Sequence, residues 1–326
     1  MLNRRQMMMA MAALPAATTR SWAAEADNYP SRMVRIITGS ASSSSDQIAR
    51  YAAFKLSPRL GQSFIIENRA GAGGTIGTAE VAKSPPDGYT LTIAHLSTHV
   101  SPTVIYPNLS YDPTADFAPI SLLMESPLVL VVHPSVPANS LEELMALAQS
   151  RKDNPLTWSS AGSGSLGQLT GELFTQHAKT NFLHVPYRGG GPALLAVVTG
   201  EVMFTFASPI NAQAQVAGKM VKALAVSSRQ RFPILPDTPG LDELGHPEME
   251  AILWQGIMAP SKTPPAIIAK LNREIRSCFD TPETREELMK QGAVVKTSSP
   301  EEFRAFLKSE LEKWTPVIKA ANIKPE

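Results

Sequence analysis

Two short stretches of small polar residues have the composition of an anion-binding loop. Residues 38–46 read TGSASSSSD and residues 160–165 read SAGSGS, and each stands between an apolar run and a helical pattern. Small side chains let a ligand approach the main chain, and the N–H groups at a helix N-terminus carry about half a positive charge. Serine hydroxyls add hydrogen bonds that suit a carboxylate. A third stretch, residues 206–211, has the same layout with less glycine.

These serines have an alternative role, which is helix capping alone. Ser45 or Asp46 would then be the N-cap of the first helix, and Ser165 the N-cap of the later one. Capping needs one such residue per helix, so a run of four serines favours ligand contact. Asp46 has two possible roles. Its carboxylate could cap the helix, or it could face a cleft and bind an amino group of the ligand, directly or through a water.

The motifs of common enzymes are incomplete in this chain. Residues 71–77 resemble a dinucleotide fingerprint but have Ile76 where the third glycine must stand, which favours a tight turn with close helix–strand packing. The G-x-S-x-G elbow of a serine hydrolase is absent around Ser163 and Ser165. Residues 189–191 are three glycines without the Lys-Ser/Thr of a phosphate-binding loop. We expect no catalytic residue and no cofactor.

The histidines and the single cysteine give no metal-binding pattern. His95 and His99 are four apart, but they follow a strand in a polar loop, with no Asp or Glu at motif distance. His133 and His184 precede prolines and are predicted at strand ends on the surface. Cys278 lies three residues after Ile275 on an apolar helix stripe and is predicted to be a buried, inert thiol. One cysteine also excludes an internal disulfide, and we expect no metal site.

The elements that must position these loops follow an alternating pattern. Apolar β-rich runs alternate with helical patterns, which predicts an α/β fold with parallel sheets covered by helices. Towards the C-terminus the pattern shifts to helices, and Trp254 is expected in the core. The predicted strands are 33–37, 63–67, 89–94, 128–132, 156–160, 203–206 and 221–226, and the predicted helices are 48–60, 76–83, 141–149, 166–177, 211–217, one from 264, and 300–320.

Length and charge limit the classes of function. A chain of 326 residues suggests about two domains. The 30 Lys and Arg residues nearly balance the 29 Asp and Glu residues, and no long basic run occurs. The chain therefore has no electrostatic footprint for nucleic acid.

The first residues have the composition of a targeting segment. Arg4 and Arg5 precede an apolar run at 7–17, and residues 21–23 supply small side chains for a signal peptidase. We expect residues 1–23 to be a secretory signal, with a frayed N-terminal helix as the alternative. The run is shorter than the ~20 residues that span a bilayer, so the mature chain is expected to be soluble and periplasmic. The paired arginines leave open both the general secretory and the twin-arginine route.

A series of motifs is similar to one known family. The motifs are YPS at 29–31, ENRAGAGG at 67–74, DGYTL at 87–91, YDP at 111–113, DFAP at 116–119, HVPY at 184–187, GK at 218–219 and KALAV at 222–226. In this order, and over nearly the whole mature chain, they resemble the substrate-binding family of tripartite tricarboxylate transporters, also called Bug proteins.

This resemblance implies a two-lobed periplasmic solute-binding protein that closes like a Venus flytrap. Domain 1 would consist of residues 27–126 plus 251–326, and domain 2 of residues 127–250. Members deliver small organic anions, often di- or tricarboxylates, to a large and a small integral-membrane subunit, driven by an ion gradient. We expect a monomer that binds its ligand and catalyses no reaction. The alternatives are a sensory binding protein that presents its ligand to a membrane receptor, and a secreted serine hydrolase.

The resemblance also implies where the ligand binds, with one departure from the family pattern. The family's Pro-Pro-Gly-Gly stretch is replaced here by Ser-Ala-Ser-Ser at 40–43, which leaves the identity of the anion open. Neither loop carries an arginine, which favours capture by neutral dipoles and ordered water. The predicted ligand-binding residues are Ser40, Ser42, Ser43, Ser44, Ser45, Asp46, Ser97, Ser160, Gly162, Ser163, Gly164, Ser165, Tyr187, Ala207 and Ser208.

Overall fold

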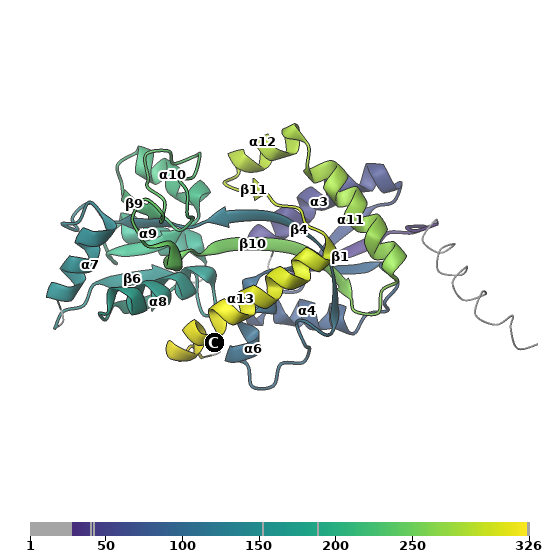
Figure 1. Ribbon diagram of the computed structural model, residues 1–326, viewed down its shortest axis with the longest axis horizontal. Helices are drawn as coiled ribbons and strands as arrows, with labels where there is room; N and C mark the ends of the chain where they lie inside the picture. Colours follow the sequence, from purple (N-terminus) through teal and green to yellow (C-terminus); the bar gives the residue numbers. More distant parts are fainter. Residues whose placement is uncertain (1–27, 40, 42, 152, 188, 325–326) are drawn as a thin grey trace, which may run out of the picture.

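The computed structural model describes residues 28–39, 41, 43–151, 153–187 and 189–324. The predicted signal at 1–23 and the predicted site residues Ser40 and Ser42 lie outside the described residues. The described chain folds into two lobes, each built on its own β-sheet (Figure 1).

The first sheet has six strands in the order β11-β4-β10-β3-β1-β2. The strand β1 runs parallel to β2 and β3, whereas β10 runs antiparallel to both β3 and β4. The prediction of an all-parallel sheet is therefore wrong, because long antiparallel strands complete it. The strands are β1 (Val34–Thr38), β2 (Phe64–Asn68), β3 (Thr90–Ala94), β4 (Phe117–Pro127), β10 (Ile252–Pro260) and β11 (Val294–Val295).

The second sheet has five strands in the order β7-β6-β8-β5-β9 and is also mixed. The strand β6 runs parallel to its neighbours, and β5 runs antiparallel to β8 and β9. The strands are β5 (Val129–Val132), β6 (Thr157–Ser160), β7 (Leu183–Pro186), β8 (Phe204–Ala207) and β9 (Lys222–Val226). The α/β class predicted from the sequence is confirmed.

Helices cover both sheets and follow the predicted alternation, with additional ones at 190–198 and 282–290. Among the described residues, no helix has the length and apolar character needed to cross a bilayer. The helices are α3 (Ser44–Leu60), η1 (Ala72–Gly74), α4 (Thr75–Ala82), α5 (Leu96–His99), α6 (Pro102–Ile105), α7 (Leu141–Ser150), α8 (Leu166–Ala178), α9 (Gly190–Val198), α10 (Pro209–Ala217), η2 (Pro247–Met249), α11 (Pro265–Phe279), α12 (Pro282–Lys290) and α13 (Pro300–Ala320).

Two paired strands connect the lobes. In Figure 1 β4 and β10 lie side by side and extend from one lobe towards the other, and they pair from Phe117↔Pro260 to Pro127↔Ile252. β4 continues directly into β5 of the second sheet, and the chain returns from β9 through η2 into β10. The C-terminal segment thus adds β10 and β11 to the first sheet, while α13 packs against both β4 and α8.

The core confirms the predictions for two side chains. Trp254 is fully buried, and its indole N–H donates to Glu310, which also accepts from Trp314. Cys278 is buried on α11, and burial raises the pKa of its thiol to about 11, so it is an inert thiol at neutral pH.

The glycine-rich stretch at 71–77 forms the predicted tight turn. η1 contains Gly73 with a φ of 64°, which favours glycine. A Cβ atom on Gly77 would lie only 3.0 Å from the side chains of Ile37 and Arg69. These contacts bring α4 close to β1, as the sequence predicted for this stretch.

Candidate ligand-binding site

A cavity of about 230 Å³ lies between the two lobes. The first lobe contributes residues from η1, α5 and α6, and the second lobe contributes the loop between β6 and α8. The volume is below the ~300–1,000 Å³ typical of sites for drug-sized ligands, which suits a small metabolite. The lining residues are Ala72, Gly73, Ser97, Ser101, Pro102, Ile105, Tyr106, Ala161, Gly162, Ser163 and Gly164.

The loop of the second lobe is fixed by its own hydrogen bonds. Gly162 and Gly164 have φ values of 113° and 69°, conformations that favour glycine. The Gly162 N–H donates to Ser160 Oγ at 3.2 Å, and the Gly164 N–H donates to Gln168 Oε1 at 2.8 Å. Ser165 caps α8 by accepting from the Gln168 N–H, which confirms the predicted N-cap. The loop is thus held in one shape before any ligand arrives.

Hydrogen bonds join the lobes across the cavity. The Gly164 carbonyl accepts from Ser101 Oγ at 3.0 Å and from Ser97 Oγ at 3.3 Å. Ser163 Oγ, in the same loop, donates to the carbonyl of Lys324, beyond the end of α13, at 2.7 Å. The second-lobe loop is therefore tied to two separate parts of the chain.

The lining of the cavity contains no ionic side chain among the described residues. A bound anion would meet serine hydroxyls, the phenol of Tyr106 and backbone groups rather than an opposing charge. No carboxylate in the lining repels it, and no arginine or lysine neutralises it. This lining can recognise an anion through oriented dipoles and bridging water.

The serine-rich turn at the start of α3 is already paired within the first lobe. Ser43 is the N-cap and its side chain accepts from the Asp46 N–H, so the predicted cap at Ser45 or Asp46 is wrong. Ser43 adopts the extended backbone that a cap requires. Gln255 of β10 accepts from the Ser44 hydroxyl and the Ser45 N–H, and donates to the Ser44 carbonyl.

Asp46 is held inside the first lobe. Its side chain is 4% exposed, and it accepts from Arg50 at 3.0 and 3.1 Å and from Asn68 Nδ2 at 2.8 Å. Both carboxylate oxygens thus have partners within the fold. Of the two roles that the sequence left open, these contacts favour the structural one.

The structure brings together only part of the predicted site. Ser97, Gly162, Ser163 and Gly164 line the cavity. Sequence reasoning missed Ser101, Ile105 and Tyr106, which lie at the start, in the last position and directly after the end of α6. The other predicted residues that the structure describes are not in the cavity lining, namely Ser43, Ser44, Ser45, Asp46, Ser160, Ser165, Tyr187, Ala207 and Ser208.

Tyr187 and Ser208, both outside the lining, differ in their contacts. The Tyr187 hydroxyl donates to Glu201 at 2.8 Å on the second lobe. Ser208 is the residue before α10, and its side chain makes no cap hydrogen bond.

His184, predicted at a strand end on the surface, lies inside β7, where Ser160 Oγ is 2.8 Å from its Nε2 and Trp158 packs against its ring.

The residues predicted as a loop around His95 form the short helix α5 instead. His99 is fully buried, its ring lies against Phe117, and its Nε2 has no hydrogen-bond partner among the described residues. Burial, with a smaller contribution from the nearby His95, lowers the pKa of His99 to about 3. The ring is therefore neutral at physiological pH.

This buried imidazole predicts a loss of stability in mild acid. In the unfolded chain the pKa of His99 returns to about 6.5. The free energy of unfolding therefore has its full value, as far as His99 is concerned, above pH 6.5, and it decreases as the pH falls from 6.5 towards 3. Between pH 7.5 and pH 4.5 His99 alone should lower the free energy of unfolding by about 3 kcal/mol. Urea denaturation of His99→Phe should show a correspondingly smaller loss than the wild type. An identical pH dependence, with His133→Gln as control, would contradict the assignment.

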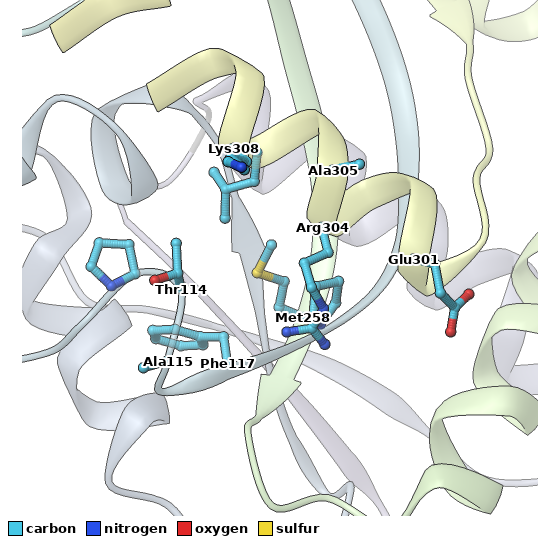
Figure 2. A pocket seen from close by; sticks show the side chains of 11 residues that line it. Thr114, Ala115, Phe117, Met258, Glu301, Arg304, Ala305 and Lys308 are labelled. Atoms are coloured by element: carbon cyan, nitrogen blue, oxygen red, sulfur yellow. The ribbon is translucent and has the colours of Figure 1, made fainter. Parts of the chain in front are cut away.

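A larger cavity, of about 610 Å³, lies within the first lobe (Figure 2). It is formed by α13 and the segment 113–119, with Phe117 and Met258 in its wall and Arg304 and Lys308 projecting from the helix. Closure of two lobes cannot enclose a ligand here, because only one lobe contributes residues. The smaller cavity is therefore the better candidate for a ligand-binding site.

The chain is similar to several known proteins. Residues 48–323 match the model of the tripartite tricarboxylate transporter family receptor. The structure of Rpa4515 from R. palustris with adipate is 31% identical, with a TM-score of 0.81, covering 91% of this chain and 100% of that one. MatC from Rhodopseudomonas palustris with bound malate is 33% identical, with a TM-score of 0.77 and coverages of 89% and 100%. The periplasmic binding protein BugD is 31% identical, with a TM-score of 0.77 and coverages of 91% and 99%.

Proposed function

Because the chain belongs to the family of tripartite tricarboxylate transporter receptors, we propose that it binds a small dicarboxylate between its two lobes. The family is one of solute-binding proteins, and the chain is a receptor rather than an enzyme. Adipate and malate, present in the structures of two relatives, are the first candidates. Each carries two carboxylates on a short carbon chain.

The observation that carries this proposal is the cavity between the lobes. Its wall combines the hydroxyls of Ser97 and Ser101 with the glycine-rich loop 161–164. The hydroxyls of Ser97 and Ser101, which donate to the Gly164 carbonyl in this structure, can turn to donate to carboxylate oxygens instead, and no described residue of the lining is acidic. The predicted residues Ser97, Gly162, Ser163 and Gly164 are the ones we propose to contact the ligand.

The division into sheets supports the proposed domains. We propose residues 27–126 plus 251–326 as domain 1 and residues 127–250 as domain 2, with β4 and β10 as the connection between them. The junction of β4 and β5 at Leu128 and the start of β10 at Ile252 lie close to these limits. Bending at these two points would open and close the cavity.

The cellular context follows from the relatives. BugD is described as a periplasmic binding protein, and we propose that this chain acts in the periplasm after removal of residues 1–23. The partner that receives the ligand would be the pair of integral-membrane subunits of a tripartite transporter. Closure would form the surface that these subunits recognise.

A thermal-shift screen tests the proposal. Adipate or malate at 100 times its dissociation constant should stabilise the chain by about 2.7 kcal/mol, and the neutral adipamide should not. The Ser97→Ala/Ser101→Ala variant removes two hydroxyls at the cavity and should weaken binding by about tenfold or more. Ser150→Ala, an exposed serine on α7, is the matched control. If dicarboxylates, aromatic acids and amino acids all leave the melting temperature unchanged, the proposal is wrong.

A further inference from the structure

Two imidazoles and a carboxylate meet on the second lobe, outside the ligand cavity. His177 lies in the last turn of α8, and His246 and Glu248 lie at the start of η2. Nε2 of His177 is 3.0 Å from Nδ1 of His246, and Oε1 of Glu248 is 3.7 Å from the same Nδ1 and 3.1 Å from Nδ1 of His177. Among the described residues this is the group in which three such donor atoms lie within 4.8 Å of one another.

These distances are close to those of a metal site. A tetrahedral Zn²⁺ with bonds of 2.0–2.1 Å places its ligand atoms about 3.3 Å apart. The distances of 3.0 and 3.7 Å from His246 Nδ1 lie on either side of that value. The 3.1 Å contact of Glu248 is to Nδ1 of His177, so with Nε2 of His177 as the ligand atom the Glu248 carboxylate has to swing towards the ion, and at 56% exposed its side chain has room to do so.

A second carboxylate, that of Glu142, lies near the other ring nitrogen of His246. Glu142 Oε1, at the start of α7, is 4.0 Å from Nε2 of His246, the ring nitrogen that faces away from His177. Histidines that bind metals usually donate their other N–H to a carboxylate or carbonyl, which fixes the ring and strengthens the metal bond. Glu142 is 51% exposed and can move the short distance that this hydrogen bond requires.

We propose that His177, His246 and Glu248 bind a divalent transition-metal ion such as Zn²⁺, with Glu142 orienting His246. Two nitrogen ligands and one oxygen ligand suit Zn²⁺, whereas Mg²⁺ and Ca²⁺ take oxygen ligands. The ion would link the end of α8 to the segment directly before β10, one of the two strands that connect the lobes. Sequence reasoning predicted no metal site, because 69 residues separate the two histidines.

The test is calorimetric titration of the untagged, chelator-treated chain with ZnCl₂. We expect one Zn²⁺ per chain and no heat from MgCl₂. His177→Ala and His246→Ala should each weaken Zn²⁺ binding at least tenfold, and Glu142→Gln should weaken it less. His133→Gln removes another histidine of the same lobe and should bind Zn²⁺ as the wild type does. Zn²⁺ should also raise the melting temperature of the wild type and not that of His246→Ala.

Two results would contradict the proposal of a metal site. One is the absence of Zn²⁺ binding by the wild type, and the other is equal affinity in His177→Ala, His246→Ala and His133→Gln. Glu248→Gln, an exposed substitution of nearly the same size, provides the test if a histidine variant does not fold, and it should also weaken binding. The dicarboxylate thermal shift is measured separately on the same variants and should persist, so failure of one proposal is distinguishable from failure of the other.

Discussion

Gly164→Ala is expected to lower the affinity for dicarboxylates by at least tenfold. Gly164 has a φ of 69°, a conformation that costs an alanine roughly 1–2 kcal/mol. Its new Cβ would also lie 3.0 Å from Ile105 Cδ1 and 3.4 Å from Ser101 Cβ, both in the opposite lobe. The methyl group therefore opposes closure directly, and isothermal titration with adipate or malate measures the effect.

Gly61→Ala separates backbone strain from this contact. Gly61 ends α3 with nearly the same φ, 68°, and a Cβ there would meet nothing within 4 Å. This variant should lose a similar amount of stability but keep its affinity for the ligand. If both variants bind as tightly as the wild type, the loop at 161–164 does not form the ligand-binding site.

Gly171→Ala is expected to lower the free energy of unfolding by about 3 kcal/mol. A Cβ on Gly171 of α8 would lie 2.1 Å from two ring atoms of Trp158, far inside contact distance. Trp158 is fully buried and stacked against Phe204, so the ring cannot move away without displacing its neighbours. Inserting a group into such a core typically costs about 1–3 kcal/mol, occasionally more. Urea denaturation gives the measurement.

Two further variants test the cause of that loss. Gly191→Ala in α9 adds the same methyl group where nothing lies within 4 Å, and it should be neutral or stabilising by up to about 1 kcal/mol. Combining Gly171→Ala with Trp158→Leu should cost less than the sum of the two single changes, because the smaller side chain removes the clash. Strict additivity would show that Trp158 is not the obstacle.

Elements with a strong local signal could be predicted from the sequence. The helix predicted at 300–320 has these same bounds in the structure, where Ser299 and Glu302 form a capping box before a long amphipathic stretch. The strands β4 and β10 were missed because both of their faces are buried, which removes the alternation of apolar and polar residues. α9 was missed because it opens with two glycines and a proline.

The residues of the candidate site were also predicted only where the local sequence carries a signal. Residues 162–164 were predicted because small polar residues follow β6, whereas Ser97, after β3, was implied only by the resemblance to the family. Ser101, Ile105 and Tyr106 could not be predicted, because they lie in or beside the one-turn helix α6, whose position depends on packing against the rest of the lobe. The N–H groups at the start of α3 carried the strongest sequence signal, yet Ser43 and Gln255 already occupy two of them.

The hydrogen bonds from Ser97 and Ser101 to the Gly164 carbonyl have a consequence for transport. They involve protein atoms alone, so they favour the shut conformation before any cargo binds. Receptors that shut while empty compete with loaded ones for the membrane subunits. Without either hydroxyl the receptor would capture its ligand less efficiently, but fewer empty receptors would reach the membrane subunits in the shut conformation.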